Sequence, residues 1–112
     1  MKKSSSDFIL EGVPDLLKMI GSNIRTARIN RNMTIKELAN RVHVDEKTIS
    51  RLESGQPSTN LKNLISILVV FGLEDGLYTI ANPQEDEVGK ALASKRQRVR
   101  VRNINMRIDD DF

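Results

Sequence analysis

Two groups of apolar residues at helical spacing, on either side of a break at residues 43–45, constrain the fold of this chain most strongly. The first group lies at positions i, i+1 and i+4, and the members of the second lie three residues apart. These residues are Leu38, Ala39 and Val42 in the first group and Ile49 and Leu52 in the second. Ala39 is small enough for another helix to cross closely, and Val44 can fill the space at the turn between the two helices. The pattern predicts a helix-turn-helix whose second helix projects polar side chains.

Capping residues mark the ends of the same two helices. Thr34, followed three residues later by Glu37, predicts a capping box at the start of the first helix. Asp45 is expected to cap the second helix, where its carboxylate also complements the positive end of the helix dipole. Gly55 follows the last turn of that helix, a position at which glycine commonly ends a helix. Apolar, small and capping positions therefore agree on one motif.

The stretch TIKELANRVHVDEKTISRLESG, residues 34–55, resembles the helix-turn-helix of the Xre type. Lambdoid phage repressors, controller proteins of restriction systems and many antitoxins share this motif. The resemblance extends from about Ile20 to about Leu77. It implies an all-α fold: a five-helix, lambda-repressor-like helix-turn-helix domain with a C-terminal helix and room for a short β-strand extension.

Two residues depart from the family pattern. His43 stands where glycine usually makes the turn, and Ile35 stands where glutamine usually opens the first helix. Histidine is among the residues enriched at positive φ, so the turn is expected to survive with some strain. The missing glutamine removes one expected contact with phosphate or base.

Composition divides the chain into three expected segments. Residues 1–13 contain serines, charges and the short apolar patch Phe8-Ile9-Leu10, and are expected to form a flexible N-terminal arm. Residues 14–81 carry the helical apolar patterns and are expected to form the DNA-binding helix-turn-helix domain. Residues 82–112 are expected to form a charged C-terminal extension for dimer, partner or DNA contacts.

Three further helices are expected around the motif. Apolar spacings of 4, 4 and 3 predict a helix over residues 15–31, which Asn32 can end in the left-handed conformation. An apolar stripe predicts another over residues 61–71, and Val69 widens it either as surplus core or as a subunit interface. A short last helix over residues 74–80 should close the domain. Its flanking and internal apolar residues, expected to point inward, are Leu73, Leu77 and Ile80.

The C-terminal extension carries two different patterns. Asn82-Pro83, then acidic residues and finally basic ones predict a helix over residues 83–96, because this charge order complements the helix dipole. Its few apolar residues cannot stabilise it alone. Residues 98–108 alternate with a period of two, which is typical of a half-exposed strand. A lone strand is unstable, so this segment needs a partner strand or stays disordered.

Composition also limits the chemistry. The 112 residues fit one domain with appendages. The chain has no cysteine and one histidine, which argues against disulfides, thiol catalysis and structural zinc, and no cofactor or metal is expected. The sequence shows no membrane span or signal peptide, so a cytoplasmic protein is expected. Motifs of nucleotide binding or of hydrolytic catalysis are missing, so we expect a binding protein and not an enzyme.

The resemblance assigns roles to individual residues. The start of a recognition helix enters the major groove, where side chains reach base edges. By family position the expected base-reading residues are Glu46, Lys47 and Arg51, with Thr48 and Ser50 flanking them. The expected phosphate-contacting residues are Lys36, Arg41, Asn60 and Lys62. In the family, the arginine corresponding to Arg28 pairs with the glutamate corresponding to Glu53 and braces the recognition helix.

Two sets of charges have alternative interpretations, one at the recognition helix and one in the C-terminal extension. Glu46 can accept from cytosine N4 and reject other bases, or it can be a second helix-terminus charge beside Asp45. The basic block of the C-terminal extension can face a polyanion or can be a solvated tail.

The sequence is compatible with three functions. The first is a repressor that binds double-stranded DNA as a homodimer, because useful affinity requires two half-sites about one helical turn apart. Within this class, the charge order of the extension is similar to that of HipB-type antitoxins, which bind a kinase-like toxin, while phage repressors and restriction controllers are alternatives. The second function is a protein-interaction module with secondary DNA binding. The third is an RNA or general nucleic-acid binder that uses the basic tail.

Overall fold

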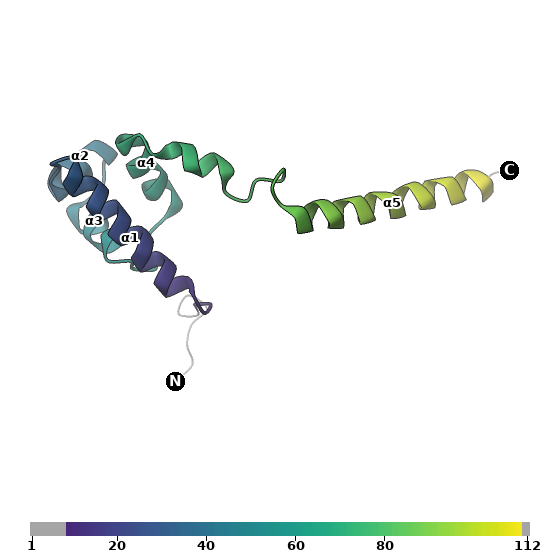
Figure 1. Ribbon diagram of the computed structural model, residues 1–112, viewed down its shortest axis with the longest axis horizontal. Coiled ribbons are helices and arrows are strands. Elements are labelled where there is room, and N and C mark those ends of the chain that lie inside the picture. Colours follow the sequence, from purple (N-terminus) through teal and green to yellow (C-terminus); the bar gives the residue numbers. More distant parts are fainter. Residues whose placement is uncertain (1–8, 111–112) are drawn as a thin grey trace. The chain divides into compact units, whose positions relative to one another are not determined.

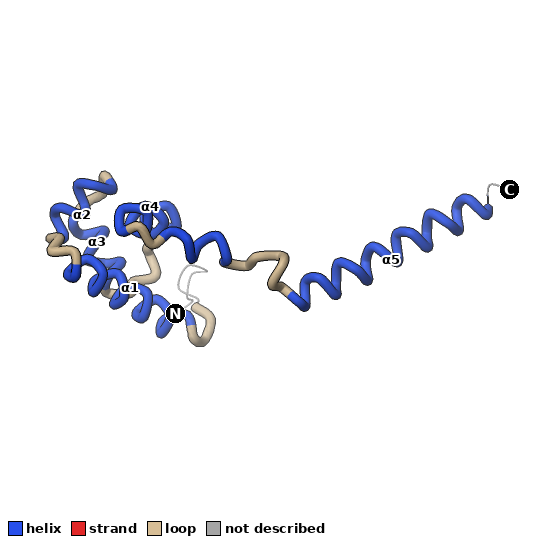
Figure 2. Tube along the Cα trace, turned by 45° about the horizontal axis from the view of Figure 1, so that its top comes forward, coloured by secondary structure: helices blue, strands red, loops and turns tan. Residues whose placement is uncertain are grey.

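The computed structural model describes residues 9–110, and the chain divides into two units, the first ending at Asp75 and the second beginning at Gly76. Within these residues every regular element is helical (Figures 1 and 2). The elements are α1 (Val13–Asn30), α2 (Ile35–Val42), α3 (Glu46–Glu53), α4 (Leu61–Phe71), the 3₁₀ helix η2 (Glu74–Thr79) and α5 (Glu87–Asp110). None of the helices found there is long and apolar enough to span a bilayer. The all-α prediction of five helices followed by a C-terminal helix is confirmed, while residues 1–8 of the expected arm lie outside the described residues.

The core of the first unit lies where α1, α2, α3 and α4 meet. Helices α1 and α2 both pack on α3, and α4 packs on α2. The buried apolar residues are Ile24, Met33, Leu38, Ala39, Val42, Ile49, Leu52, Ile67 and Phe71. All five apolar residues that defined the motif belong to this core. Their burial fixes which sides of α2 and α3 turn inward, and thereby which sides face solvent.

The Thr34 hydroxyl caps the start of α2 by accepting a hydrogen bond from the backbone N–H of Glu37 at 3.0 Å. At the other end of α2, the turn that leads to α3 has the strained backbone that the sequence predicts. His43 ends α2 with φ 58° and ψ 49°, which is the left-handed region. Asp45 occupies the N-cap position of α3, but its side chain makes no capping hydrogen bond, so that part of the prediction is wrong. The Asp45 carbonyl instead accepts from the N–H of Thr48 at 3.0 Å.

His43→Gly is expected to stabilise the domain by up to about 1 kcal/mol. Glycine adopts a positive φ without the side-chain clash that histidine meets there. Asn32→Gly is a matched control, because Asn32 also has a positive φ of 54° but asparagine tolerates this region better. Urea unfolding of both variants measures the difference. A clear loss of stability in His43→Gly would mean that the imidazole makes an interaction worth more than the strain.

Helix α1 approaches the end of α3 so closely that its backbone leaves no space for a side chain. A Cβ on Gly21 would lie 2.5 Å from the carbonyl oxygen of Leu52 and 2.6 Å from that of Glu53. Gly55, just beyond α3, has φ 77°, and a Cβ there would lie 2.7 Å from Cα of Lys18. The two glycines therefore bring α1 and the end of α3 into backbone contact.

The far end of α1 is attached to α4. The Arg31 Nη2 donates to the carbonyl oxygen of Phe71 at 3.0 Å, and the guanidinium lies 5.0 Å from the centroid of the Phe71 ring. Asn32 follows with the positive φ that was predicted to end the helix. Arg31, the residue that follows α1, thus ties the C-terminal end of this helix to α4.

The last helix of the domain, η2, is shorter and tighter than predicted. Leu73 and Ile80 both lie outside η2, which runs from Glu74 to Thr79, so the helix does not place them on the side of Leu77. Leu77 is partly buried, but Leu73 and Ile80 are exposed, so the inward orientation predicted for these two residues is wrong.

The prediction of a strand over residues 98–108 is also wrong, because this segment belongs to the continuous helix α5. Arginine and methionine, which have high helix propensity, supply five of its eleven residues, while its valines and isoleucines lower helix propensity only slightly. The predicted helix over residues 83–96 begins later, at Glu87. The Asp86 carboxylate accepts from the N–H of Gly89 at 2.9 Å, so Asp86 and not Asn82 caps the start of α5.

Candidate DNA-binding surface

Helix α3 presents an exposed polar face opposite its two core residues. Ile49 and Leu52 are buried, and the residues one helical turn apart on the other side face solvent. The exposed residues are Glu46, Lys47, Ser50 and Arg51, whereas Thr48 is partly buried. The structure therefore brings four of the five predicted base-reading residues onto one accessible face and places Thr48 at its edge.

A fork of hydrogen bonds attaches the end of α3 to α1. The Arg28 Nε donates to Glu53 Oε2 at 2.7 Å, and its Nη2 donates to Glu53 Oε1 at 3.0 Å. The two side chains are 11% and 5% exposed, so this pair is shielded from water. Bidentate arginine–carboxylate pairs are both stronger and more directional than single contacts. This geometry fixes the rotation of α3 as well as its distance from α1.

Arg28 also holds the turn that leads into the motif. Its Nη1 donates to the carbonyl oxygen of Met33 at 2.8 Å. The hydrogen bond to Glu53 raises the pKa of Arg28 above its ordinary value, although burial acts in the opposite direction. A raised pKa contributes stability that is lost only when the pH rises through it, far above neutrality. The Arg28 charge should therefore not make the stability vary with pH near neutrality.

The predicted phosphate-contacting residues are all exposed on the elements that flank α3. Lys36 lies in the first turn of α2, Arg41 in its last turn, and Lys62 in the first turn of α4. Asn60 caps α4, because its side-chain oxygen accepts from the N–H of Asn63 at 2.9 Å. Its oxygen is thus engaged within the protein, and its amide group is the part that can donate to a phosphate.

Arg25 is a candidate contact that the sequence did not single out. It is exposed on α1 and lines a shallow groove together with Ser50 and Ser54 of the recognition motif. The Arg28–Glu53 pair forms another part of the same groove. The available signal was the three-residue spacing between Arg25 and Arg28, which places the two on neighbouring turns of one helix.

Comparison with known proteins agrees with this geometry. Residues 24–76 match the model of a helix-turn-helix family, from the middle of α1 to η2. This segment is similar to that helix-turn-helix family, and its all-α arrangement is consistent with the lambda-repressor-like fold. The match supports a DNA-binding transcriptional regulator. No curated protein matches the chain.

Proposed function

We propose that this protein is a repressor that binds double-stranded DNA as a homodimer and reads a palindromic operator with α3. The observation that carries the proposal is the exposed polar face of α3, held in a fixed orientation by the Arg28–Glu53 fork. Recognition helices of this motif enter the major groove with such a face toward the bases.

The chemistry of the α3 face suits direct base readout. Lys47 and Arg51 are cationic donors, and both can donate to O6 and N7 of guanine. Glu46 can accept from N4 of cytosine, and its carboxylate would be repelled by phosphate wherever that amino group is missing. Glu46 therefore adds selectivity more than affinity.

The flanking residues suit a sequence-independent grip on the backbone. Lys36, Arg41 and Lys62 carry exposed positive charges, and the Asn60 amide adds a neutral donor. Such contacts set the register of a protein on the duplex without reading its sequence.

An exposed apolar stripe on α4 supports the homodimer. Leu61, Ile65 and Val69 follow one another every four residues and are 68%, 38% and 53% exposed. The sequence left two interpretations of Val69 open, a subunit interface and surplus core, and this exposure favours the subunit interface. Because each domain presents one recognition helix, joining two copies doubles the number of base contacts on a symmetric site.

Selection of bound sequences from a pool of random duplex DNA tests the proposal. We expect enrichment of a palindrome whose half-sites are separated by about one helical turn, or 10–10.5 base pairs. Sedimentation should show a dimer, and Ile65→Glu with Val69→Glu should give a folded monomer with weakened operator binding. Gln84→Glu, an exposed change in the segment between η2 and α5, is the control for an added negative charge. Failure of the pool to yield any enriched sequence would contradict the proposal.

The antitoxin hypothesis is the finer form of this proposal. It is supported by the charge order of residues 82–112, in which acidic residues precede the basic block. The strand that would have completed the likeness is replaced by α5, so the support is now the charge order alone. A neighbouring reading frame that encodes a kinase-like protein, and co-purification of its product with this chain, would support the antitoxin role. A neighbouring methyltransferase or endonuclease would instead indicate a restriction controller.

A further inference from the structure

Helix α5 carries an unusually one-sided charge for its length. Between Glu87 and Asp109 there is no acidic residue. The basic residues in this interval are Lys90, Lys95, Arg96, Arg98, Arg100, Arg102 and Arg107. A segment of this composition is suited to a polyanionic partner.

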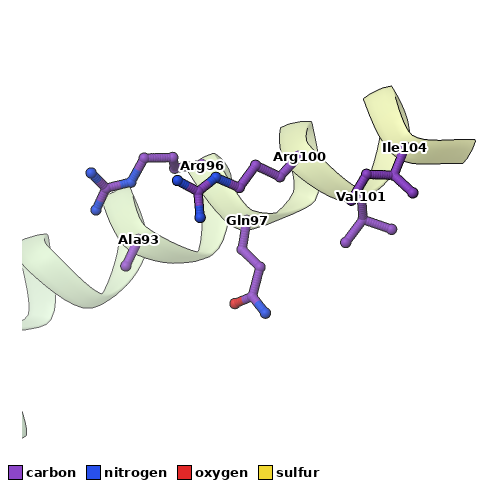
Figure 3. Close-up of a pocket in the computed structure, with 6 residues that line it drawn as sticks. All are labelled: Ala93, Arg96, Gln97, Arg100, Val101 and Ile104. Atoms are coloured by element: carbon purple, nitrogen blue, oxygen red, sulfur yellow. The ribbon is translucent and has the colours of Figure 1, made fainter. Parts of the chain in front are cut away.

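The helical backbone sorts the central arginines into two opposed rows. Successive residues of an α-helix turn by about 100°, so residues two apart point to nearly opposite sides and residues four apart share a side. Arg96 and Arg100 therefore form a first row, and Arg98 and Arg102 form a second row on the other side of α5. Figure 3 shows Arg96 and Arg100 extending in the same direction, with Gln97 pointing away from them.

The positive charges of the two rows are not neutralised by other described side chains. The ion pair found on α5 joins Lys90 to Glu87 at 3.4 Å, and none of the four arginines pairs with a carboxylate among the side chains that the structure describes. All four arginines are exposed. Like charges four residues apart on a helix repel each other and destabilise it. A bound polyanion would remove this repulsion, so the helix and the partner would stabilise each other.

We infer that α5 is a second DNA-contacting element, which lies in the major groove with one arginine row toward each phosphate wall. An α-helix with its side chains is about 10–12 Å wide, and the major groove of B-DNA is about 12 Å wide. Two rows on opposite sides of the helix match the two walls of such a groove. An acidic protein surface, by contrast, offers one wall and would leave the other row unpaired.

The contacts made by α5 should supply affinity and not sequence selectivity. Between the rows lie Gln97, Val99 and Val101, which offer one amide group and otherwise apolar surface. The arginines reach phosphates, which are the same at every sequence. This inference rests on the proposed function in one respect, namely that DNA is the natural polyanion of a chain with a helix-turn-helix domain.

The salt dependence of binding to a random-sequence 30-base-pair duplex tests the inference in the full chain. Changing Arg96, Arg98, Arg100 and Arg102 together to Gln should make the plot of log K against log salt less steep, by about 0.9 for each arginine in contact. Each row changed alone should account for about half of this reduction. The matched control replaces the same four residues with Lys, which keeps the charges and should keep most of the slope. Circular dichroism should show that both variants remain helical, since Gln and Lys are good helix formers.

Two results would overturn the inference. The first is an unchanged salt slope in the Gln variant; if that variant also binds poly-glutamate more weakly, the partner is an acidic protein. The second is a reduction that comes from one row alone, because α5 would then lie across a surface and not within a groove. Neither of these results depends on base readout by α3, whose failure would instead appear as equal affinities for selected and random DNA.

Discussion

Arg28→Ala is expected to destabilise the domain by about 3–5 kcal/mol, because the truncation leaves the shielded Glu53 carboxylate without a partner. The Met33 carbonyl oxygen also loses the donor that Arg28 supplies at 2.8 Å. The loss should appear in urea unfolding at neutral pH as a lower midpoint with an unchanged slope. It should also weaken DNA binding, because α3 would no longer be held in one orientation.

Two further variants separate the charge pair from general effects of truncation. Arg25→Ala removes an exposed arginine one turn earlier on α1 and should change stability by less than about 0.5 kcal/mol. The double variant Arg28→Met with Glu53→Met should recover much of the loss, since it leaves no unpaired buried charge. Similar stabilities for Arg28→Ala and Arg25→Ala would show that the fork contributes little.

Gly21→Ala is expected to destabilise the domain, although the same change in most helices is favourable by about 1 kcal/mol. The added methyl would lie 2.5 Å from the Leu52 carbonyl oxygen and 2.6 Å from that of Glu53, and neither backbone atom can move without displacing α3. Overpacking of this kind typically costs about 1–3 kcal/mol, occasionally more.

Gly76→Ala is the matched control for Gly21→Ala. A Cβ at Gly76 meets no atom within 4 Å, and this glycine does not have a positive φ. Thermal unfolding of the two variants should therefore give a clearly lower midpoint for Gly21→Ala and little change for Gly76→Ala. A stabilised Gly21→Ala variant would mean that α1 does not contact the end of α3 as closely as described.

The motif could be predicted from sequence because local signals there agree with tertiary packing. Leu38 and Ile49 follow the helical period and are fully buried, and Thr34 and His43 mark the helix end and the turn by their own chemistry. The close approach at Gly21 could not be predicted in this way. A glycine inside a helical pattern does not reveal which backbone it will face.

Helix α5 shows where the periodicity argument fails. Its apolar residues are exposed among the side chains that the structure describes, so no buried face selects one period over another. Arginine at every second position from residue 96 to 102 fits an alternating strand, and it equally fits a helix with two opposed rows. Intrinsic propensity, which favours the helix, was the better guide here.

The affinity ratio between selected operator DNA and random DNA, measured for Lys47→Ala and Arg51→Ala, tests most directly the claim that α3 reads bases. Each change should lower this ratio by the equivalent of about 1–3 kcal/mol and relax the base preference at one position. Lys36→Ala is the control, because loss of a phosphate contact should weaken both affinities alike and reduce the salt slope by about one unit. If both α3 variants keep the ratio of the unchanged protein, α3 is not the recognition helix.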